Sequence, residues 1–131
     1  MGRLGKLAGG VALAGGMAIA CGGTSSSSPS PTTTPAVTTN TITITNNAAS
    51  PQNITVTRGS QVTILNSDSR THEMDSDPHP EHTDCPELNQ IGFLNPGQSR
   101  QSGNLNTARR CGMHDHNSPD TAALKVTITI L

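Results

Sequence analysis

Four short segments of this chain have isoleucine or valine at every second position, and this alternation strongly limits the folds that the chain can adopt. The alternation occurs at residues 41–45 (TITIT), 53–57 (NITVT), 61–66 (QVTILN) and 125–131 (KVTITIL). A period of two places these side chains on one face, which is typical of half-buried antiparallel strands. No helical stripe of comparable length occurs. The pattern therefore predicts an all-β sandwich of about six to eight strands.

The connecting segments fit this prediction. Residues 58–60 (RGS) form a turn between two strands, and residues 95–98 (NPGQ) form another. Residues 99–110 are expected to supply one or two weaker strands, and Pro86–Gln90 a single helical turn.

The first part of the chain resembles an export signal. Residues 1–20 contain a short basic start and an apolar run too short and too glycine-rich to span a membrane. The run ends in AIAC at residues 18–21, which resembles a bacterial lipoprotein signal and implies lipidation of Cys21. An ordinary secretory signal cleaved near Ala20 is the alternative. Both place the mature chain in the cell envelope or beyond it.

Residues 21–36 are rich in Ser, Thr and Pro and carry no charge, so they are expected to form a flexible tether. A lipid anchor and a tether would hold a soluble domain beside the periplasmic or extracellular face of a membrane. Residues 37–131 remain for one small domain, which we expect to be a monomer.

The composition limits both core and partners. Trp and Tyr are absent and Phe93 is the only aromatic residue, so Ile, Val and Leu must build the core. A core this lean would benefit from a metal or a disulfide. The chain has no basic stripe and no stacking aromatics, which argues against nucleic-acid binding.

Two segments resist assignment to strands, residues 67–90 and 112–120. These segments or their edges contain every histidine and both cysteines that follow Cys21: His72, His79, His82, Cys85, Cys111, His114 and His116. Long loops in a compact domain are often functional. A thiolate with several imidazoles suits copper or zinc, whereas no catalytic motif is visible, so we expect a binding protein rather than an enzyme.

The pattern P-x-N-I-x-V-x2-G-x2-V-x-I-x-N-x-D-x3-H at residues 51–72 resembles the strand–turn–strand of cupredoxins. In that family this segment delivers the first copper-binding histidine. The later L-x-P-G-x-S at residues 94–99 resembles the turn before the penultimate strands, and Cys111 then falls at a strand end. The resemblance covers residues 38–131 and implies a cupredoxin-like Greek-key β-sandwich.

The resemblance also implies a site for one copper ion. His72 would be the first histidine ligand and Cys111 the thiolate. His114 lies three residues after Cys111, as in plastocyanin-like loops, and His116 lies five after it, as in azurin-like loops. His114 is favoured, with His116 as an additional ligand.

The axial ligand departs from the family pattern, because no methionine follows Met113. The axial position would be open or filled by His116, by Glu73 or Asp115, or by a backbone oxygen. An extra histidine or carboxylate would resemble a red-copper site more than a blue one.

Two alternatives stay open for the cysteines. An exported protein with two cysteines often pairs them, and a Cys85–Cys111 disulfide would remove the thiolate. Alternatively, His79, His82 and Cys85 could form a second metal site.

The expected role is single-electron transfer with a redox partner protein outside the cytoplasmic membrane. A copper carrier or sequestration protein is the first alternative. A disulfide-stapled β-sandwich that binds a partner without metal is the second.

Overall fold

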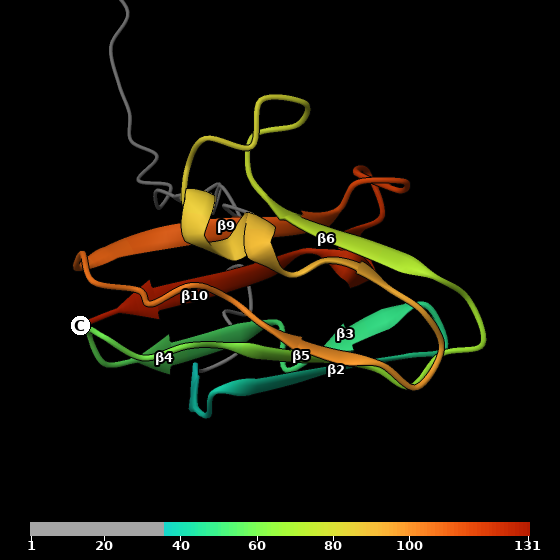
Figure 1. Ribbon diagram of the computed structural model, residues 1–131, viewed down its shortest axis with the longest axis horizontal. Helices are drawn as coiled ribbons and strands as arrows, with labels where there is room; N and C mark the ends of the chain where they lie inside the picture. Colours follow the sequence, from blue (N-terminus) through green and yellow to red (C-terminus); the bar gives the residue numbers. More distant parts are fainter. Residues whose placement is uncertain (1–35) are drawn as a thin grey trace, which may run out of the picture. The chain divides into compact units, whose positions relative to one another are not determined.

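The computed structural model describes residues 36–131; the predicted signal, most of the tether and Cys21 lie outside the described residues. The described part forms two sheets (Figure 1). The larger sheet has the order β1 (Val37–Thr38), β4 (Asn53–Val56), β10 (Val126–Ile130), β9 (Arg109–Asp115), β6 (His72–Ser76), β7 (Gly92–Leu94). The smaller sheet has the order β3 (Ala48–Ser50), β2 (Thr41–Thr45), β5 (Thr63–Asn66), β8 (Ser99–Gln101). The predicted all-β sandwich is confirmed, with ten strands among the described residues instead of the six to eight expected.

The segment predicted as strand–turn–strand spans both sheets. β4 lies in the six-stranded sheet and β5 in the four-stranded sheet, so the chain crosses between layers rather than closing a hairpin. Gly59 has a φ of 81° in this crossing, a conformation that glycine adopts without steric cost. Because of the crossing, β2 pairs with β5 and β4 with β10 in parallel, whereas β9 pairs antiparallel with both β10 and β6.

The core is aliphatic, as the composition requires. The alternating isoleucines of β2, β4, β5 and β10 are almost completely buried: Ile42, Ile44, Ile54, Ile64, Ile128 and Ile130. Burial of each such side chain contributes about 1.5–3 kcal/mol before the loss of conformational entropy. Phe93 lies on β7 with 56% of its surface exposed and takes no part in this core.

Both segments left as loops by the sequence contain strand. His72–Ser76 is β6, and β9 continues through His114 to Asp115 because these residues pair with β6. Polar side chains hid these strands from an alternation pattern based on apolar residues. The helical turn predicted at Pro86–Gln90 is confirmed as the 3-10 helix η1, and a second one, η2, covers Ala122–Leu124. No helix among residues 36–131 is long and apolar enough to cross a membrane.

Candidate metal centre

The two cysteines of the domain form a disulfide. The sulfurs of Cys85 and Cys111 are bonded, their Cα atoms lie 5.9 Å apart, and both residues are fully buried. Neither sulfur is then a thiolate, which is the form that binds metals. The expectation that Cys111 is a copper ligand is therefore not met, and neither is the ligand role considered for Cys85. The disulfide alternative is the one observed.

The strand geometry separates the predicted copper ligands further. Cys111 and His114 are three residues apart on β9, so their side chains point to opposite faces of the sheet. β6 and β9 are antiparallel and Met74 pairs with Asp115, so His72 corresponds in register to residue 117. That position is six residues along the chain from Cys111. At about 3.3 Å per residue this is roughly 20 Å. His72, Cys111 and His114 therefore do not form one site in this structure.

His72 has carboxylate neighbours instead. Its Nδ1 lies 2.5 Å from Asp115 Oδ2 and its Nε2 lies 3.3 Å from Asp68 Oδ2, in a buried position. The backbone N–H groups of Asn47 and Ser69 donate to Asp68 and hold the pKa of that carboxyl below its ordinary value. Asp115, proposed as an axial ligand, thus orients His72 and ties β6 to the end of β9.

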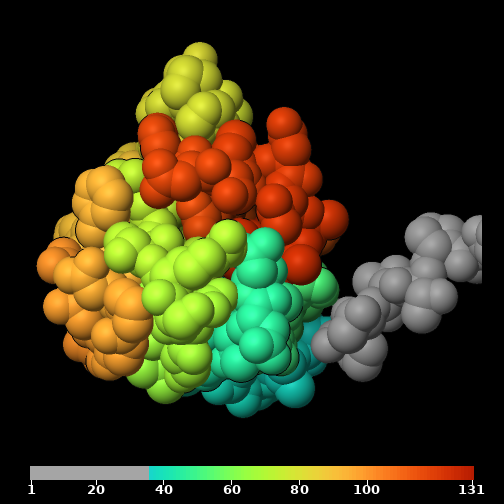
Figure 2. All heavy atoms as spheres, turned by 90° about the vertical axis from the view of Figure 1, so that its right-hand side faces the viewer, coloured from blue at the N-terminus to red at the C-terminus, as the bar shows by residue number. Residues whose placement is uncertain are grey.

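The remaining four histidines come together at one end of the sandwich. His79 and His82 lie on the loop after β6, His114 lies on β9, and His116 follows β9 directly. Their ring centroids are 4.8–5.6 Å apart in five of the pairings. Figure 2 shows the loop around residue 80 (yellow) protruding beside the segment that follows β9 (red). The cluster therefore contains His114 and His116 from the predicted copper site and His79 and His82 from the predicted second site.

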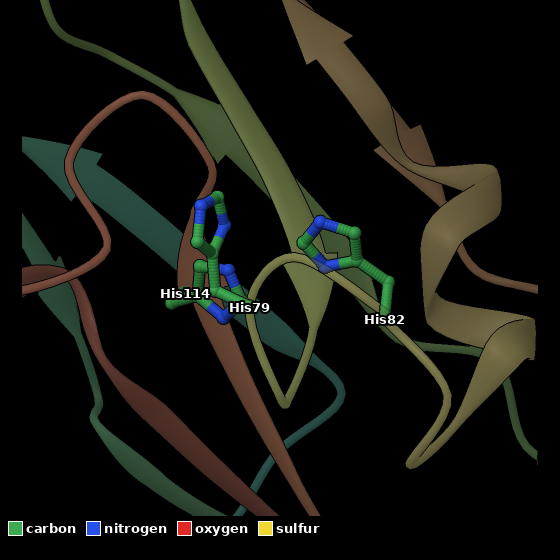
Figure 3. Close-up of side chains that lie close together, drawn as sticks. All are labelled: His79, His82 and His114. Atoms are coloured by element: carbon green, nitrogen blue, oxygen red, sulfur yellow. The ribbon is translucent and has the colours of Figure 1, made fainter.

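Three of these histidines have the geometry of a metal site. Nitrogen atoms of His79, His82 and His114 all lie within 4.8 Å of one another. Figure 3 shows the three rings gathered between the loop and β9. A small shift of flexible side chains would bring the three nitrogens to the distance of about 2.0–2.1 Å from one ion that metal-bound imidazoles require.

His114 is already oriented for binding. Its Nδ1 lies 2.5 Å from Asp77 Oδ1, so this nitrogen carries the proton that it donates to the carboxylate. Its Nε2 is buried and has no hydrogen-bond partner among the described residues. A buried, unpartnered nitrogen is unfavourable unless a ligand occupies it. A carboxylate behind a histidine is also the usual support of a metal-binding imidazole.

His82 has the same arrangement with a backbone partner. Its Nδ1 lies 2.8 Å from the carbonyl oxygen of Ser76, which can only accept, so Nδ1 is the donor. The lone pair of neutral His82 is then on Nε2, which lies 2.9 Å from Nδ1 of His116. Nε2 of His82 and Nε2 of His114 are thus both presented as metal-binding atoms.

The loop that carries His79 and His82 is fastened to β9 at Gly112. Asp77 N–H donates to the Gly112 carbonyl, and Gly112 N–H donates to Oδ2 of Asp84, each at 3.0 Å. The loop is closed by a bond of 2.7 Å from Asp84 N–H to the Asp77 carbonyl. The Cys85–Cys111 disulfide joins the next residue of the loop to the neighbouring residue of β9. These bonds hold the candidate ligands of the loop, His79 and His82, close to the candidate ligand of β9, His114.

A cavity of about 410 Å³ opens beside these histidines. It is lined by Asp77, Pro78, His79, His114, Pro119, Asp120 and Lys125. Of the clustered histidines, His79 and His114 line this cavity.

The sequence did not indicate the groups that orient the ligands. Asp77 belongs to an acidic segment in which any carboxylate was an equal candidate, and Gly112 was one glycine among many. The spacing of two between Asp77 and His79 carries no distinctive signal. Only the strand pairing of β6 with β9 places Asp77 beside His114.

Comparison with known proteins supports the fold and nothing more specific. No model of a known protein family and no curated protein sequence matches the chain. A purple cupredoxin from Nitrosopumilus maritimus superposes with a TM-score of 0.55 and 17% identity, over 71% of this chain and 100% of that one. Plastocyanin from Dryopteris crassirhizoma superposes with a TM-score of 0.54 and 20% identity, over 70% of this chain and 99% of that one. A reduced amicyanin mutant superposes with a TM-score of 0.54 and 14% identity, over 73% of this chain and 82% of that one. The chain has the cupredoxin fold.

Proposed function

We propose that this chain binds one copper ion through His79, His82 and His114 and serves as a copper carrier or sequestration protein. The buried Nε2 of His114, which has no hydrogen-bond partner among the described residues, is the observation that carries the proposal. Three imidazoles fit the metal, because this donor set suits Cu(II) and Zn(II), and Cu(II) binds the more tightly of the two. Two proteins with a similar fold are described with copper, amicyanin in its Cu(I) form and a copper-containing nitrite reductase.

The chain's own residues would do the following at this site. Asp77 and the Ser76 carbonyl hold the Nδ1 protons of His114 and His82, which leaves the lone pair of each ring on Nε2. The disulfide and the backbone bonds at Gly112 keep the loop against β9. Bound copper would supply a positive charge held by these three imidazoles.

Single-electron transfer with a partner protein is the second candidate. Its support is the fold, since a plastocyanin of the same fold is described in oxidised and reduced forms. A thiolate ligand would require reduction of the disulfide and a rearrangement of β9, because Cys111 and His114 face opposite sides of the strand. The carrier role needs neither change, and for this reason we favour it.

The lipid anchor at Cys21 and the cell-envelope location remain part of the proposal. A disulfide is at home in an oxidising compartment, which supports export. A tethered, monomeric copper carrier would pass its ion to a partner at the membrane surface.

The test is a titration of the purified protein with Cu(II), followed by calorimetry and by visible and electron paramagnetic resonance (EPR) spectra. The proposal predicts one ion per chain, nitrogen ligands, and no intense thiolate-to-copper band. His114→Ala is expected to weaken binding, whereas Glu81→Gln, an exposed change in the same loop, leaves it unchanged. An intense band that disappears in Cys111→Ser would instead establish the electron-transfer site.

A further inference from the structure

The histidine cluster offers a second metal position that overlaps the first. Oxygen and nitrogen atoms of Asp75, His82 and His116 also lie within 4.8 Å of one another. The side chains of Asp75 and His116 are 12% and 38% exposed, and Nδ1 of His116 lies 3.7 Å from Asp75 Oδ2. His82 belongs to both sets, and each of the other ligands belongs to only one.

The distance between His82 and His116 fits a shared ion. Nε2 of His82 and Nδ1 of His116 are 2.9 Å apart. Two nitrogens that each lie about 2.0–2.1 Å from one ion are about 2.9 Å apart at a right angle and about 3.3 Å apart at a tetrahedral angle. In this structure His116 donates its Nδ1 proton to His82, because Nδ1 of His82 is already a donor to Ser76. An ion between these two nitrogens would replace that single proton.

His82 can serve only one position at a time. Its Nδ1 is engaged by the Ser76 carbonyl, so Nε2 is its single ligand atom and cannot bind two ions. The two sets are therefore alternative positions for one ion and not two independent sites. They also differ in donors, with three imidazoles in the first position and two imidazoles and a carboxylate in the second.

We infer that this protein has two exclusive positions for one divalent transition-metal ion, with His82 as the common ligand, an inference that rests on the proposed function. The ion passes between His79 and His114 on one side and Asp75 and His116 on the other, without leaving His82. A path of stepwise ligand exchange at the end of the molecule gives a metal carrier a route for loading and release. No bond other than metal–ligand bonds forms or breaks, apart from transfer of the single ring proton of His116 from Nδ1 to Nε2 through solvent, which frees Nδ1 for the ion.

The inference makes a definite prediction about paired substitutions. If each position can hold the ion alone, His114→Ala and His116→Ala each lower Cu(II) affinity by no more than about tenfold. The double variant then loses far more than the product of the two single effects, because neither position is complete. His114→Ala also changes the EPR spectrum toward fewer nitrogen ligands and one carboxylate oxygen, while His116→Ala retains the wild-type spectrum of the first position.

The experiment is a double-substitution cycle on the intact protein with Cu(II) and Zn(II), measured by competition with a chelator of known affinity. A second cycle with His79→Ala and Asp75→Asn repeats the test at the other ligand of each position, and the exposed His79 guards against misfolding of the His114 variants. Glu81→Gln is the control. Circular dichroism and thermal unfolding establish that each variant is folded.

The outcomes separate the two proposals. A loss in His114→Ala equal to that of the double variant would overturn the second position, and so would single effects that simply multiply. Binding of two ions per chain would overturn the sharing of His82. If the wild-type protein binds neither metal, the proposed function fails first.

Discussion

Gly112 provides the space in which the carboxylate of Asp77 lies. A Cβ atom at residue 112 would overlap Oδ2 of Asp77, and it would also be too close to the rest of that side chain. Asp77 in turn accepts the hydrogen bond that orients His114. A residue without a side chain thus determines how the proposed metal ligand His114, on the same strand, is held.

Replacing Gly112 with Ala is expected to weaken metal binding by up to about tenfold without removing any ligand. The new methyl group displaces Asp77, and His114 loses its orientation. Titration with Zn(II) and Cu(II) measures the effect. Gly97→Ala is the matched control, because Gly97 has a φ of 78° and no neighbour within 4 Å of a Cβ atom. That variant should lose some stability and keep full metal affinity; equal affinity losses in both would contradict the role of Gly112.

Asp77→Ala tests the carboxylate itself. Loss of a carboxylate that supports a metal-bound histidine typically costs 10- to 100-fold in affinity. Because the position at Asp75, His82 and His116 would remain, the loss expected here is up to about tenfold. Asp84→Asn is a suitable comparison, since Asp84 bonds to the Gly112 backbone and touches no histidine ring in the hydrogen bonds described. If Asp77→Ala binds metal as tightly as wild type, His114 is not oriented by this contact.

The disulfide should matter for both stability and metal affinity. The Cys85→Ser/Cys111→Ser variant is expected to lose about 2–5 kcal/mol of unfolding free energy. Its metal affinity should also fall, because the loop with His79 and His82 is no longer joined to β9. Denaturant unfolding and metal titration measure the two effects. Counting thiols in denatured protein should show two more after reduction than before; an unchanged count would mean that the cysteines are not paired.

His72 is expected to be structural. His72→Gln should leave Cu(II) affinity within about twofold of wild type, since both ring nitrogens of His72 are paired with the carboxylates of Asp115 and Asp68. The variant should lose about 1–3 kcal/mol of stability, because a buried carboxylate loses its partner. A large loss of copper affinity with the fold intact would favour the electron-transfer site after all.

Asp68 should contribute to the pH dependence of stability. Its pKa is lowered in the folded state by the N–H groups of Asn47 and Ser69, so folding favours the ionised form. The resulting stabilisation is present above the ordinary pKa of aspartate, about 3.9, and is lost as the pH falls through the lower folded value. Asp68→Asn should therefore be less stable than wild type near neutral pH and lose less stability on acidification below about pH 4.

Urea unfolding at several pH values, with Glu81→Gln as control, measures this difference. Parallel pH profiles for wild type and Asp68→Asn would show that the carboxylate makes no such contribution.

The alternation of isoleucine and valine was sufficient to predict the strands that carry the core. β2, β4, β5 and β10 are visible in the sequence because their buried faces need apolar residues at every second position. β6 and the end of β9 could not be recognised in this way, because His72, Asp75 and His114 are buried polar residues whose partners are distant in sequence. Hydrophobic alternation carries no information about such strands.

The alternation and the residue types were sufficient to predict the all-β fold, an aliphatic core, and the set of histidines and cysteines available for chemistry. They left open whether Cys111 binds copper or forms a disulfide with Cys85. The three-dimensional arrangement resolves this choice, because the register of β9 against β6 and β10 fixes which side chains share a face. One face of β9 presents Cys111 to Cys85, and the other presents His114 to the loop histidines. Spacing along the chain cannot distinguish a loop, where neighbouring residues can converge, from a strand, where residues an odd number apart must diverge.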